Sequence, residues 1–336
     1  MKKVLVVLLI VLMTIPIFAG GRRQGDGVHV FRFVSGPAGA VARQTIEIFL
    51  DYIENNSGGQ IRVEAFLEGS LFANAEDMLS ATQSNIVQGA MEADMALSWA
   101  APEWISWSSV PFAFENNDQV FRFFMGPIGR EINSRLERDF NIRFLDTGFG
   151  ARGPRMLTAN RPIRTPADMQ GLRFRVPNVI GTIASWEAMG ANVIGVPWGE
   201  LFTSLQTGLV DAQENPFAQI DSGAFFQVQR YIMETAHQIG PQFFFVNNDF
   251  WQSLSPELQT VFNNANRVAW DFWNQATAAE DAELRQKFID AGNVIIPASE
   301  MNIAAFRSLI AERVVTNPQI TGAWAPGGWD YIQSLR

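Results

Sequence analysis

One arginine at the carboxyl end of an apolar segment has the clearest chemical role in this sequence. Arg175 lies in the run Leu172 to Val176, which has the composition of a buried strand, and Pro177 follows it. Burial of a guanidinium without a counter-charge is costly. The carboxylate of a ligand offsets that cost through two parallel charge-assisted hydrogen bonds. We therefore predict that Arg175 binds the carboxylate of a small organic acid.

A second arginine stands two residues earlier in the same predicted strand. Arg173 and Arg175 share one face, because successive side chains of a strand point to opposite sides. Ligands of open α/β sheets bind beyond the carboxyl ends of the strands, which favours Arg175. We expect Arg173 to be solvated or salt-bridged. The alternative is that Arg175 is itself paired with a carboxylate of the chain, such as Glu200 or Glu214.

Three further side chains are candidates for the same ligand site. Asn215 closes a polar run before a proline, and it offers an amide to a carboxylate or hydroxyl unless it is only a turn former. The glycine-containing segment 150–156 carries Arg152 and Arg155; we favour Arg155 as a ligand contact, and the alternative is that both are surface charges. Trp198 follows another predicted strand, and we expect its ring to form an apolar wall of the cleft rather than part of the core.

The sequence lacks the motifs of the common catalytic and metal-binding classes. It has no cysteine, and it has no Gly-x-Ser-x-Gly nucleophile motif. The only histidines, His29 and His237, have no metal-ligand spacing. No acidic loop has the calcium pattern, and no glycine-rich phosphate loop occurs. We therefore expect no enzyme activity, no metal and no cofactor.

The elements that must position these side chains alternate between strands and helices. The first two predicted strands flank a helix with one apolar face, and such a βαβ unit implies parallel strands and a right-handed crossover. The same alternation returns in the second half of the chain and predicts two α/β lobes with a cleft between them. The predicted strands include residues 28–34, 61–66, 172–176, 193–196 and 209–212.

A long helix is predicted near the carboxyl terminus. Ser255 has the properties of an N-cap, Pro256 suits the first helical position, and an apolar stripe runs from Leu258 to about Phe288. A helix of about 30 residues is longer than one small lobe is wide. We therefore predict an α/β fold of two lobes with a long helix that bridges them.

The amino terminus has the order of a secretory signal. Two lysines come first, an apolar run extends from Val4 to Phe18, and small residues follow at 19–21. We expect residues 1–21 to be removed, with an uncleaved membrane anchor as the alternative. The net charge of the 336 residues is −9, and loss of that segment leaves 23 basic and 34 acidic side chains, or −11. We expect no binding to nucleic acid, and an anionic ligand must be attracted by a locally positive cleft.

At several motifs the chain resembles the DctP-type solute-binding subunits of TRAP transporters, the tripartite ATP-independent periplasmic carriers. The resemblance implies a two-lobed fold of the periplasmic-binding-protein type that holds an organic acid between its lobes. We expect the first lobe to comprise residues 22–152 and 241–280, and the second lobe 153–240 and 281–336. The motifs that carry the resemblance include Asn160 to Ile163, Gly171 to Pro177, Leu205 to Gly208 and Asp211 to Pro216.

The resemblance also implies roles for the candidate residues. Arg175 is similar to the carboxylate-clamping arginine of the family, and Arg155 to its second cleft arginine. Asn215 is similar to the asparagine of the Gln-Glu-Asn-Pro motif, and Trp198 to an aromatic position that lines the pocket. The implied partners are the small and large TRAP membrane subunits, and the implied location is the periplasm. We expect a monomer.

The sequence departs from the family pattern in the first lobe. The loop from Met95 to Ala101 is shorter than usual, and Phe72 stands where a glycine is common. Because this side of the cleft supplies many ligand-selective contacts in the family, the ligand is predicted only as an organic acid. Two alternatives are an exported lyase or isomerase with Glu200, Asp211 or Glu214 as its base, and a receptor that serves a membrane sensor.

Overall fold

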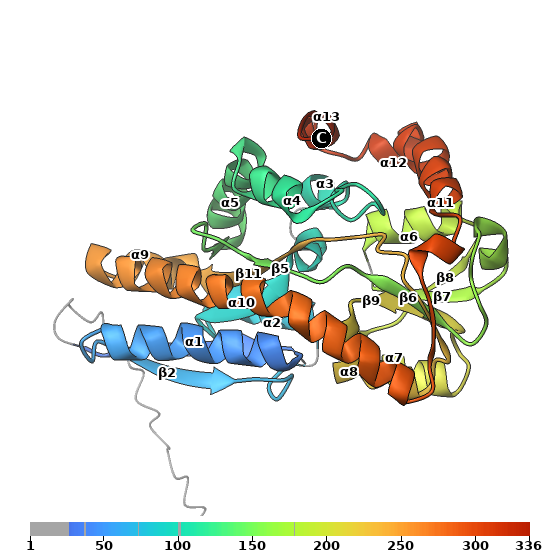
Figure 1. The fold of residues 1–336 in the computed structure, drawn as a ribbon. Helices are drawn as coiled ribbons and strands as arrows, with labels where there is room; N and C mark the ends of the chain where they lie inside the picture. Colours follow the sequence, from blue (N-terminus) through green and yellow to red (C-terminus); the bar gives the residue numbers. More distant parts are fainter. Residues whose placement is uncertain (1–26, 37, 73, 100–101, 178) are drawn as a thin grey trace, which may run out of the picture.

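The computed structural model describes residues 27–36, 38–72, 74–99, 102–177 and 179–336. It contains two mixed sheets, each flanked by helices, and the long helix runs along both (Figure 1). The predicted two-lobed α/β architecture is therefore confirmed. The predicted signal segment lies outside the described residues. Within the described part of the chain, no helix combines the length and the hydropathy needed to cross a bilayer.

The first sheet begins with the predicted βαβ unit. Strands β1 (His29–Ser35), β2 (Ile61–Phe66) and β3 (Gly89–Ala93) are parallel, and helix α1 (Ala40–Asn56) connects the first two. The buried side of α1 packs against the long helix, with residues such as Ile46, Phe49 and Ile53 inside. Strand β11 (Pro241–Asn247) pairs with β3 and is antiparallel to this unit. Strands β4 (Ile142–Phe144) and β5 (Gly150–Ala151) pair with β11 in antiparallel fashion, so they run in the direction of β3.

Aromatic side chains fill the space between the first sheet and its helices. The rings of Phe49 and Phe244 stack with their centroids 3.9 Å apart, and Phe31 meets Phe262 edge to face at 5.0 Å. Such pairs add to the burial of large apolar areas. This core explains how a chain without cysteine holds its first lobe together.

The second sheet carries the predicted ligand arginine near its edge. Its strands lie in the order β12 (Val294–Ile296), β10 (Tyr231–Met233), β6 (Met156–Ala159), β9 (Ala212–Asn215), β7 (Arg173–Val176) and β8 (Asn192–Gly195). Strands β7, β8 and β9 are parallel, so their carboxyl ends meet at one edge of the sheet. That edge contains Arg175 of β7 and Asn215 of β9.

One predicted strand was placed too early in the chain. The apolar residues Leu209 and Val210 suggested a strand at 209–212, whereas β9 spans Ala212–Asn215. Leu209 lies in a turn and is 54% exposed. The polar side chains of β9 are buried because they hydrogen-bond to one another and to β6, a pairing that local hydropathy does not reveal.

Two chain segments cross side by side from one sheet to the other. The backbone N–H of Arg152 donates to the carbonyl of Gly240 at 3.2 Å, and that of Arg155 donates to Gln238 at 2.9 Å. Both segments connect a strand of the first sheet to a strand of the second, β5 to β6 and β10 to β11. Paired crossings of this kind supply a natural hinge between two lobes.

The long helix is α10, which spans Pro256–Asp290 and has 35 residues. Ser255 caps it by accepting a hydrogen bond from the backbone of Leu258, and Pro256 takes the first turn, as predicted. At roughly 50 Å the helix extends beside both sheets (Figure 1). It packs on α1 of the first lobe and on α8 (Phe217–Ser222) of the second, so the prediction of a bridging helix is confirmed.

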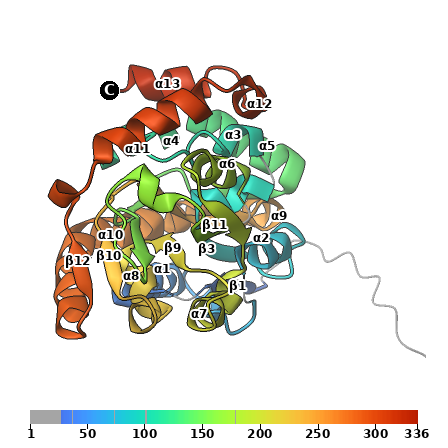
Figure 2. The same cartoon turned by 90° about the vertical axis from the view of Figure 1, so that its right-hand side faces the viewer.

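The last helices reach both halves of the molecule (Figure 2). Helix α11 (Ile303–Ile310) packs on α6 (Ile180–Ala188) beside the second sheet, whereas α13 (Gly328–Ser334) packs on α4 (Asn117–Phe124) of the first half. The Arg122 guanidinium donates to the carbonyl of Leu335 at 2.6 Å. The predicted lobe boundaries stay a prediction, and these contacts add a link between the halves at the carboxyl terminus.

Candidate functional site

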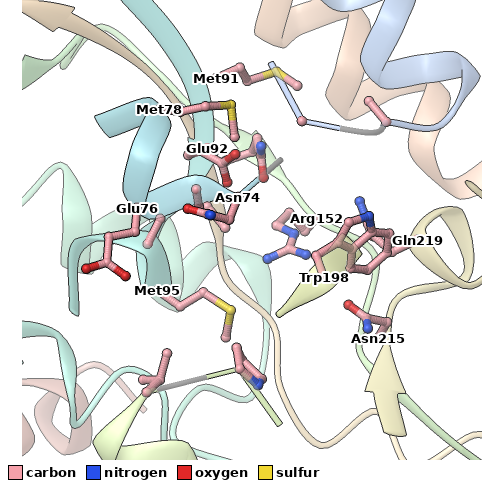
Figure 3. Close-up of a pocket in the computed structure, with 18 of the residues that line it drawn as sticks. Asn74, Glu76, Met78, Met91, Glu92, Met95, Arg152, Trp198, Asn215 and Gln219 are labelled. Atoms are coloured by element: carbon pink, nitrogen blue, oxygen red, sulfur yellow. The ribbon is translucent and has the colours of Figure 1, made fainter. Parts of the chain in front are cut away.

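A cavity of about 330 Å³ lies between the two sheets. Side chains from the first half, the second half and the crossing segments all contribute to its wall (Figure 3). The four residues predicted for the ligand site, Arg175, Arg155, Asn215 and Trp198, all line this cavity. Their assignment as ligand contacts stays a prediction, but the fold does bring them together. Other lining residues include Asn74, Met78, Met91, Glu92, Met95, Arg152, Gln219 and Gln242.

Arg175 is buried in the cavity wall with a relative exposure of 4%. Its Nε and Nη2 atoms donate to the carbonyl of Val196 at 2.9 and 2.7 Å. Burial is the main cause that lowers the pKa of Arg175; Glu214 opposes this shift and Arg155 adds to it, and the resulting pKa of about 10 keeps the side chain protonated at neutral pH. Among the described residues no carboxylate forms an ion pair with it. The alternative pairing of Arg175 with Glu200 or Glu214 is therefore not what the structure shows.

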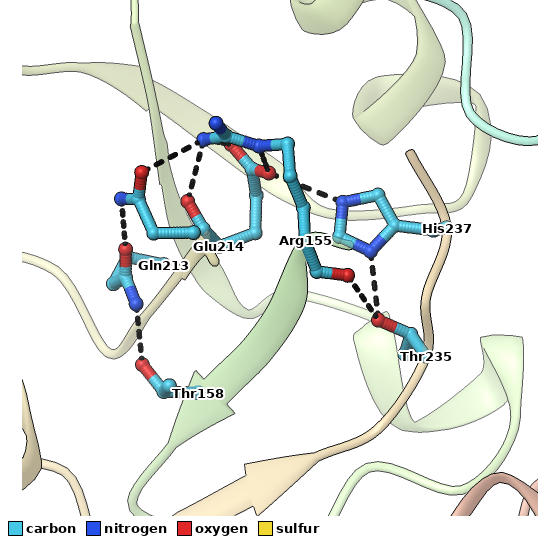
Figure 4. Close-up of polar contacts among 7 residues, drawn as sticks. Arg155, Thr158, Gln213, Glu214, Thr235 and His237 are labelled. Atoms are coloured by element: carbon cyan, nitrogen blue, oxygen red, sulfur yellow. Dashed lines mark hydrogen bonds and ion pairs between the residues drawn. The ribbon is translucent and has the colours of Figure 1, made fainter. Parts of the chain in front are cut away.

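Arg155 is the arginine that Glu214 neutralises. Its Nη2 donates to the Glu214 carboxylate at 2.7 Å and to the Glu214 carbonyl at 2.9 Å, and its Nε also contacts the carboxylate. The two side chains are 5% and 0% exposed (Figure 4). Arg155 therefore reaches the cavity with its charge already balanced, and a contact with the ligand stays a prediction.

A histidine completes this buried network from the other crossing segment. The Nε2 atom of His237 lies 3.1 Å from the Glu214 carboxylate, and its Nδ1 lies 2.7 Å from the hydroxyl of Thr235 (Figure 4). Burial lowers the pKa of His237, which favours the neutral ring; a proton on Nε2 then satisfies both contacts. Burial raises the pKa of Glu214, but Arg155 and His237 outweigh that effect and lower it to about 2.

Asn215 is held at the end of β9 by the same network. Its Oδ1 accepts from Arg155 at 3.0 Å, and its Nδ2 donates to Gln213, whose own amide donates to Thr158 at 2.9 Å (Figure 4). The alternative of a simple turn former is contradicted, because Asn215 is a buried strand residue. The network fixes the orientation of the amide before any ligand arrives.

Trp198 begins helix α7 (Trp198–Gln206), directly after Pro197. Its ring packs edge to face on Phe225 with centroids 5.1 Å apart, and its remaining surface lines the cavity. The side chain therefore belongs both to a core cluster and to the cavity wall. The core contact keeps the ring in place for a ligand.

Three charged residues of the cavity lining were missed in the sequence: Arg152, Glu92 and the exposed Glu76. Arg152 was given no role in the ligand site, and a surface position was only the alternative for it and Arg155; it lines the cavity, and its Nε is buried without a hydrogen-bond partner. Burial and the nearby charge of Arg155 lower the pKa of Arg152, the acids Asp94, Glu92 and Glu214 oppose the shift, and the resulting pKa is about 10. The signal for Arg152 was its place between two glycines in a crossing segment.

Glu92 is the second missed residue and lies on β3 of the first sheet. Burial raises the pKa of Glu92 to about 7, against the opposing effects of Arg152 and of a hydrogen bond from the backbone of Ala93. A single acid in the apolar strand Gly89–Ala93 is unusual, because a charge is rarely kept in a core strand without a partner or a function. That pattern could have identified it.

The three carboxylates considered as enzymatic bases are not poised for catalysis. Glu200 is exposed, and Asp211 is bound by the guanidinium of Arg173 at 2.9 and 2.5 Å. Glu214 contacts Arg155 and His237, and its pKa of about 2 keeps it deprotonated at neutral pH. In the described part of the chain, no cluster of three or more His, Cys, Asp or Glu side chains could hold a metal ion.

The comparison with protein families identifies the chain. Residues 35–316 match the DctP family model, whose description is bacterial extracellular solute-binding protein, family 7. The chain belongs to the DctP family. It is therefore a solute-binding protein of the TRAP type and not an enzyme, and the resemblance seen in its motifs is confirmed.

Similar DctP proteins cover most of the chain. A solute-binding protein of Roseobacter denitrificans is 30% identical over 269 residues, which are 80% of each chain. The crystal structure of a TRAP periplasmic solute-binding protein from that species, with bound L-galactonate, has a TM-score of 0.82 at 27% identity and covers 92% of this chain and 99% of its own.

Two further relatives bind sugar acids according to their descriptions. The 2,3-diketo-L-gulonate-binding periplasmic protein YiaO of Escherichia coli is 27% identical over 79% of each chain. A TRAP periplasmic solute-binding protein of Pseudomonas putida F1, with bound D-glucuronate, has a TM-score of 0.81 at 25% identity and covers 91% of this chain and 97% of its own. These ligands are properties of the relatives.

Proposed function

We propose that this protein captures a small organic acid by binding its carboxylate at Arg175 and passes it to the membrane subunits of a TRAP transporter. The observation that carries the proposal is the buried guanidinium of Arg175 in a cavity between two lobes, with no acidic partner in the described residues. Membership of the DctP family supports the same function.

The donors of Arg175 that remain free suit a carboxylate. A guanidinium has five N–H donors, and two of those of Arg175 donate to Val196. The Nη1 and Nη2 atoms therefore keep N–H groups that can form a bidentate, end-on pair with a ligand carboxylate. The Val196 contacts hold the plane of the guanidinium, so little side-chain entropy is lost when the ligand binds.

Residues on both sides of the cavity then complete the site as the lobes close. The paired crossing segments act as the hinge, and α10 braces both lobes. The ligand favours the closed form only to the extent that it binds that form more tightly than the open one. The closed shape is what the small and large membrane subunits recognise.

The proposed location of the mature protein is outside the cytoplasm, in the periplasm, as a monomer. The order of residues 1–21 supports removal of a secretory signal. The negative net charge of the chain keeps non-specific anions away, whereas the cavity concentrates three arginines.

A thermal-shift screen of organic acids on the purified mature protein tests this function. A cognate acid at 100 times its Kd is expected to stabilise the protein by about 2.7 kcal/mol, and native mass spectrometry is expected to show one bound acid per chain. Incubation with that acid should yield no new product. Absence of stabilisation by any carboxylate, or conversion of the acid to a product, would overturn the proposal.

A further inference from the structure

Two charged side chains of opposite sign share the cavity without pairing with each other. The Arg152 side chain has no hydrogen bond or ion pair to the residues that the structure describes, and its Nε is buried. The Glu92 carboxylate is hydrogen-bonded by the backbone of Ala93 and by no side chain in those ranges. In Figure 3 the Arg152 guanidinium lies between Glu92 and Asn74 on one side and Trp198 and Asn215 on the other.

The charges of the cavity wall leave room for one carboxylate of the ligand. Arg155 is neutralised by Glu214, Arg152 and Glu92 are of opposite sign, and Glu76, the other acid of the lining, is exposed to solvent. Arg175 is then the cation that remains to be balanced. A second ligand carboxylate beside Arg152 would also lie near the acid of Glu92, and like charges at short range repel each other.

A hydroxyl group satisfies both Arg152 and Glu92. A guanidinium only donates hydrogen bonds and an ionised carboxylate only accepts them, whereas a hydroxyl does both. One ligand hydroxyl, or two adjacent ones, can accept from Arg152 and donate to Glu92. A ligand without hydroxyls covers both groups without completing their hydrogen bonds, which costs binding free energy.

We propose that Arg152 and Glu92 form a hydroxyl-binding subsite and that the ligand is a polyhydroxylated monocarboxylic acid of the sugar-acid class. This inference rests on the proposed function, since Arg175 must hold the carboxylate. The cavity of about 330 Å³ lies at the lower end of the range for small-molecule sites, about 300–1,000 Å³. Trp198 offers an aromatic face to the C–H groups of such a ligand, and Met78 and Met95 supply adaptable apolar contacts.

The first test compares ligands on the unaltered mature protein by titration calorimetry. The probes are L-galactonate and D-glucuronate as polyhydroxylated monoacids, and succinate as a dicarboxylate without hydroxyls. At least one of the sugar acids is expected to bind on the order of 10- to 100-fold more tightly than succinate, the equivalent of one or two charge-assisted hydrogen bonds. Succinate binding as tightly as both sugar acids, or more tightly, would overturn the inference.

The second test uses the variants Glu92→Gln and Arg152→Gln with the same probes. Each is expected to weaken sugar-acid binding on the order of 10-fold and to change succinate binding less than 3-fold. The double variant is expected to lose less than the product of the single effects, since both groups bind the same hydroxyl. The controls are Glu200→Gln and Arg173→Ala, two exposed residues outside the cavity lining.

The outcomes separate this inference from the proposed function. Equal loss of sugar acid and succinate in Glu92→Gln and Arg152→Gln would reject the hydroxyl subsite and keep the carboxylate site at Arg175. If none of the three acids binds and no other carboxylate of the thermal-shift screen stabilises the protein, the proposed function itself is rejected. The comparison of probes on the unaltered protein gives an answer even where a variant does not fold.

Discussion

Arg155 and Glu214 form a buried ion pair directly beside the cavity, with the Arg155 Nη2 2.7 Å from a Glu214 carboxylate oxygen. This pair decides which arginine is left for a ligand. Glu214 on β9 forms its ion pair with Arg155 of the crossing segment. Arg175 on β7 therefore keeps its charge unbalanced. A buried site with one unbalanced positive charge is a site for one carboxylate.

Replacement of Arg175 is expected to remove most of the ligand affinity. Arg175→Ala deletes the charge that faces the ligand carboxylate, and we expect a loss of about 2–5 kcal/mol of binding, which corresponds to roughly 30- to 5,000-fold. Titration calorimetry with the acid found in the screen measures it. Arg173→Ala, which removes an exposed arginine two residues earlier in the same strand, is the matched control. Unchanged affinity in Arg175→Ala would show that the guanidinium is structural.

Removal of one partner of the buried pair is expected to destabilise the fold. Glu214→Gln leaves the Arg155 guanidinium buried without its counter-charge, and such a change costs about 3–5 kcal/mol. Urea unfolding measures the difference. The control is Asp211→Asn, which breaks the exposed pair with Arg173 and is expected to cost about 0–1 kcal/mol. Equal losses in the two variants would contradict the special role of burial.

The Arg155–Glu214 ion pair makes the free energy of unfolding depend on pH. Glu214 has a folded-state pKa of about 2 against an ordinary value of 4.5, so its contribution is complete above pH 4.5 and is lost as pH falls toward 2. The difference in free energy of unfolding between the unaltered protein and Glu214→Gln should therefore shrink over that interval. Urea titrations at pH 6, 4.5 and 3.5 follow it. A difference that stays constant down to pH 3.5 would mean that Glu214 has an ordinary pKa.

The titration of Glu92 is expected to change the stability of the fold in the opposite direction, with a loss as pH rises. Its folded-state pKa of about 7 lies above the ordinary 4.5, so the stability that depends on its proton is present below pH 4.5 and is lost as pH rises through 7. Without ligand, Glu92→Gln should be more stable than the unaltered protein at pH 8 and should lose this advantage at pH 5. Melting temperatures at both values, with Glu200→Gln as the exposed control, measure the effect. An advantage of equal size at pH 5 and pH 8 would contradict it.

Local sequence patterns predicted a large part of this molecule. The βαβ unit, strand β7 and the limits of α10 follow from apolar spacing, N-caps and prolines within a few residues of one another. Arg175 could be found in this way because its signal is local: a charge at the carboxyl end of an apolar strand. The motifs of residues 160–217 also identified the family, which the match over 35–316 confirms.

The roles of the other charged residues depended on contacts between distant parts of the chain. Glu214 pairs with Arg155, 59 residues away, and the charge of Glu92 on β3 acts on Arg152 in the crossing segment. In the sequence, Arg155 was favoured as a ligand contact and Arg152 was given no role, and the pairing of Arg155 with Glu214 could not be seen. The position of β9 was misjudged for a related reason, since its polar side chains are satisfied by β6 and not by nearby residues.

The sequence by itself determined most of the secondary structure around the site, the two-lobed class and the position of Arg175 at the carboxyl end of a buried strand, because backbone propensity and burial pattern act over short stretches of chain. The tertiary structure alone decided which arginine is neutralised and which stays available, and it placed Glu92 on the opposite wall. Electrostatic interactions depend on distance and burial in space, and residues far apart in the chain become neighbours only when the two sheets and their crossing segments are assembled.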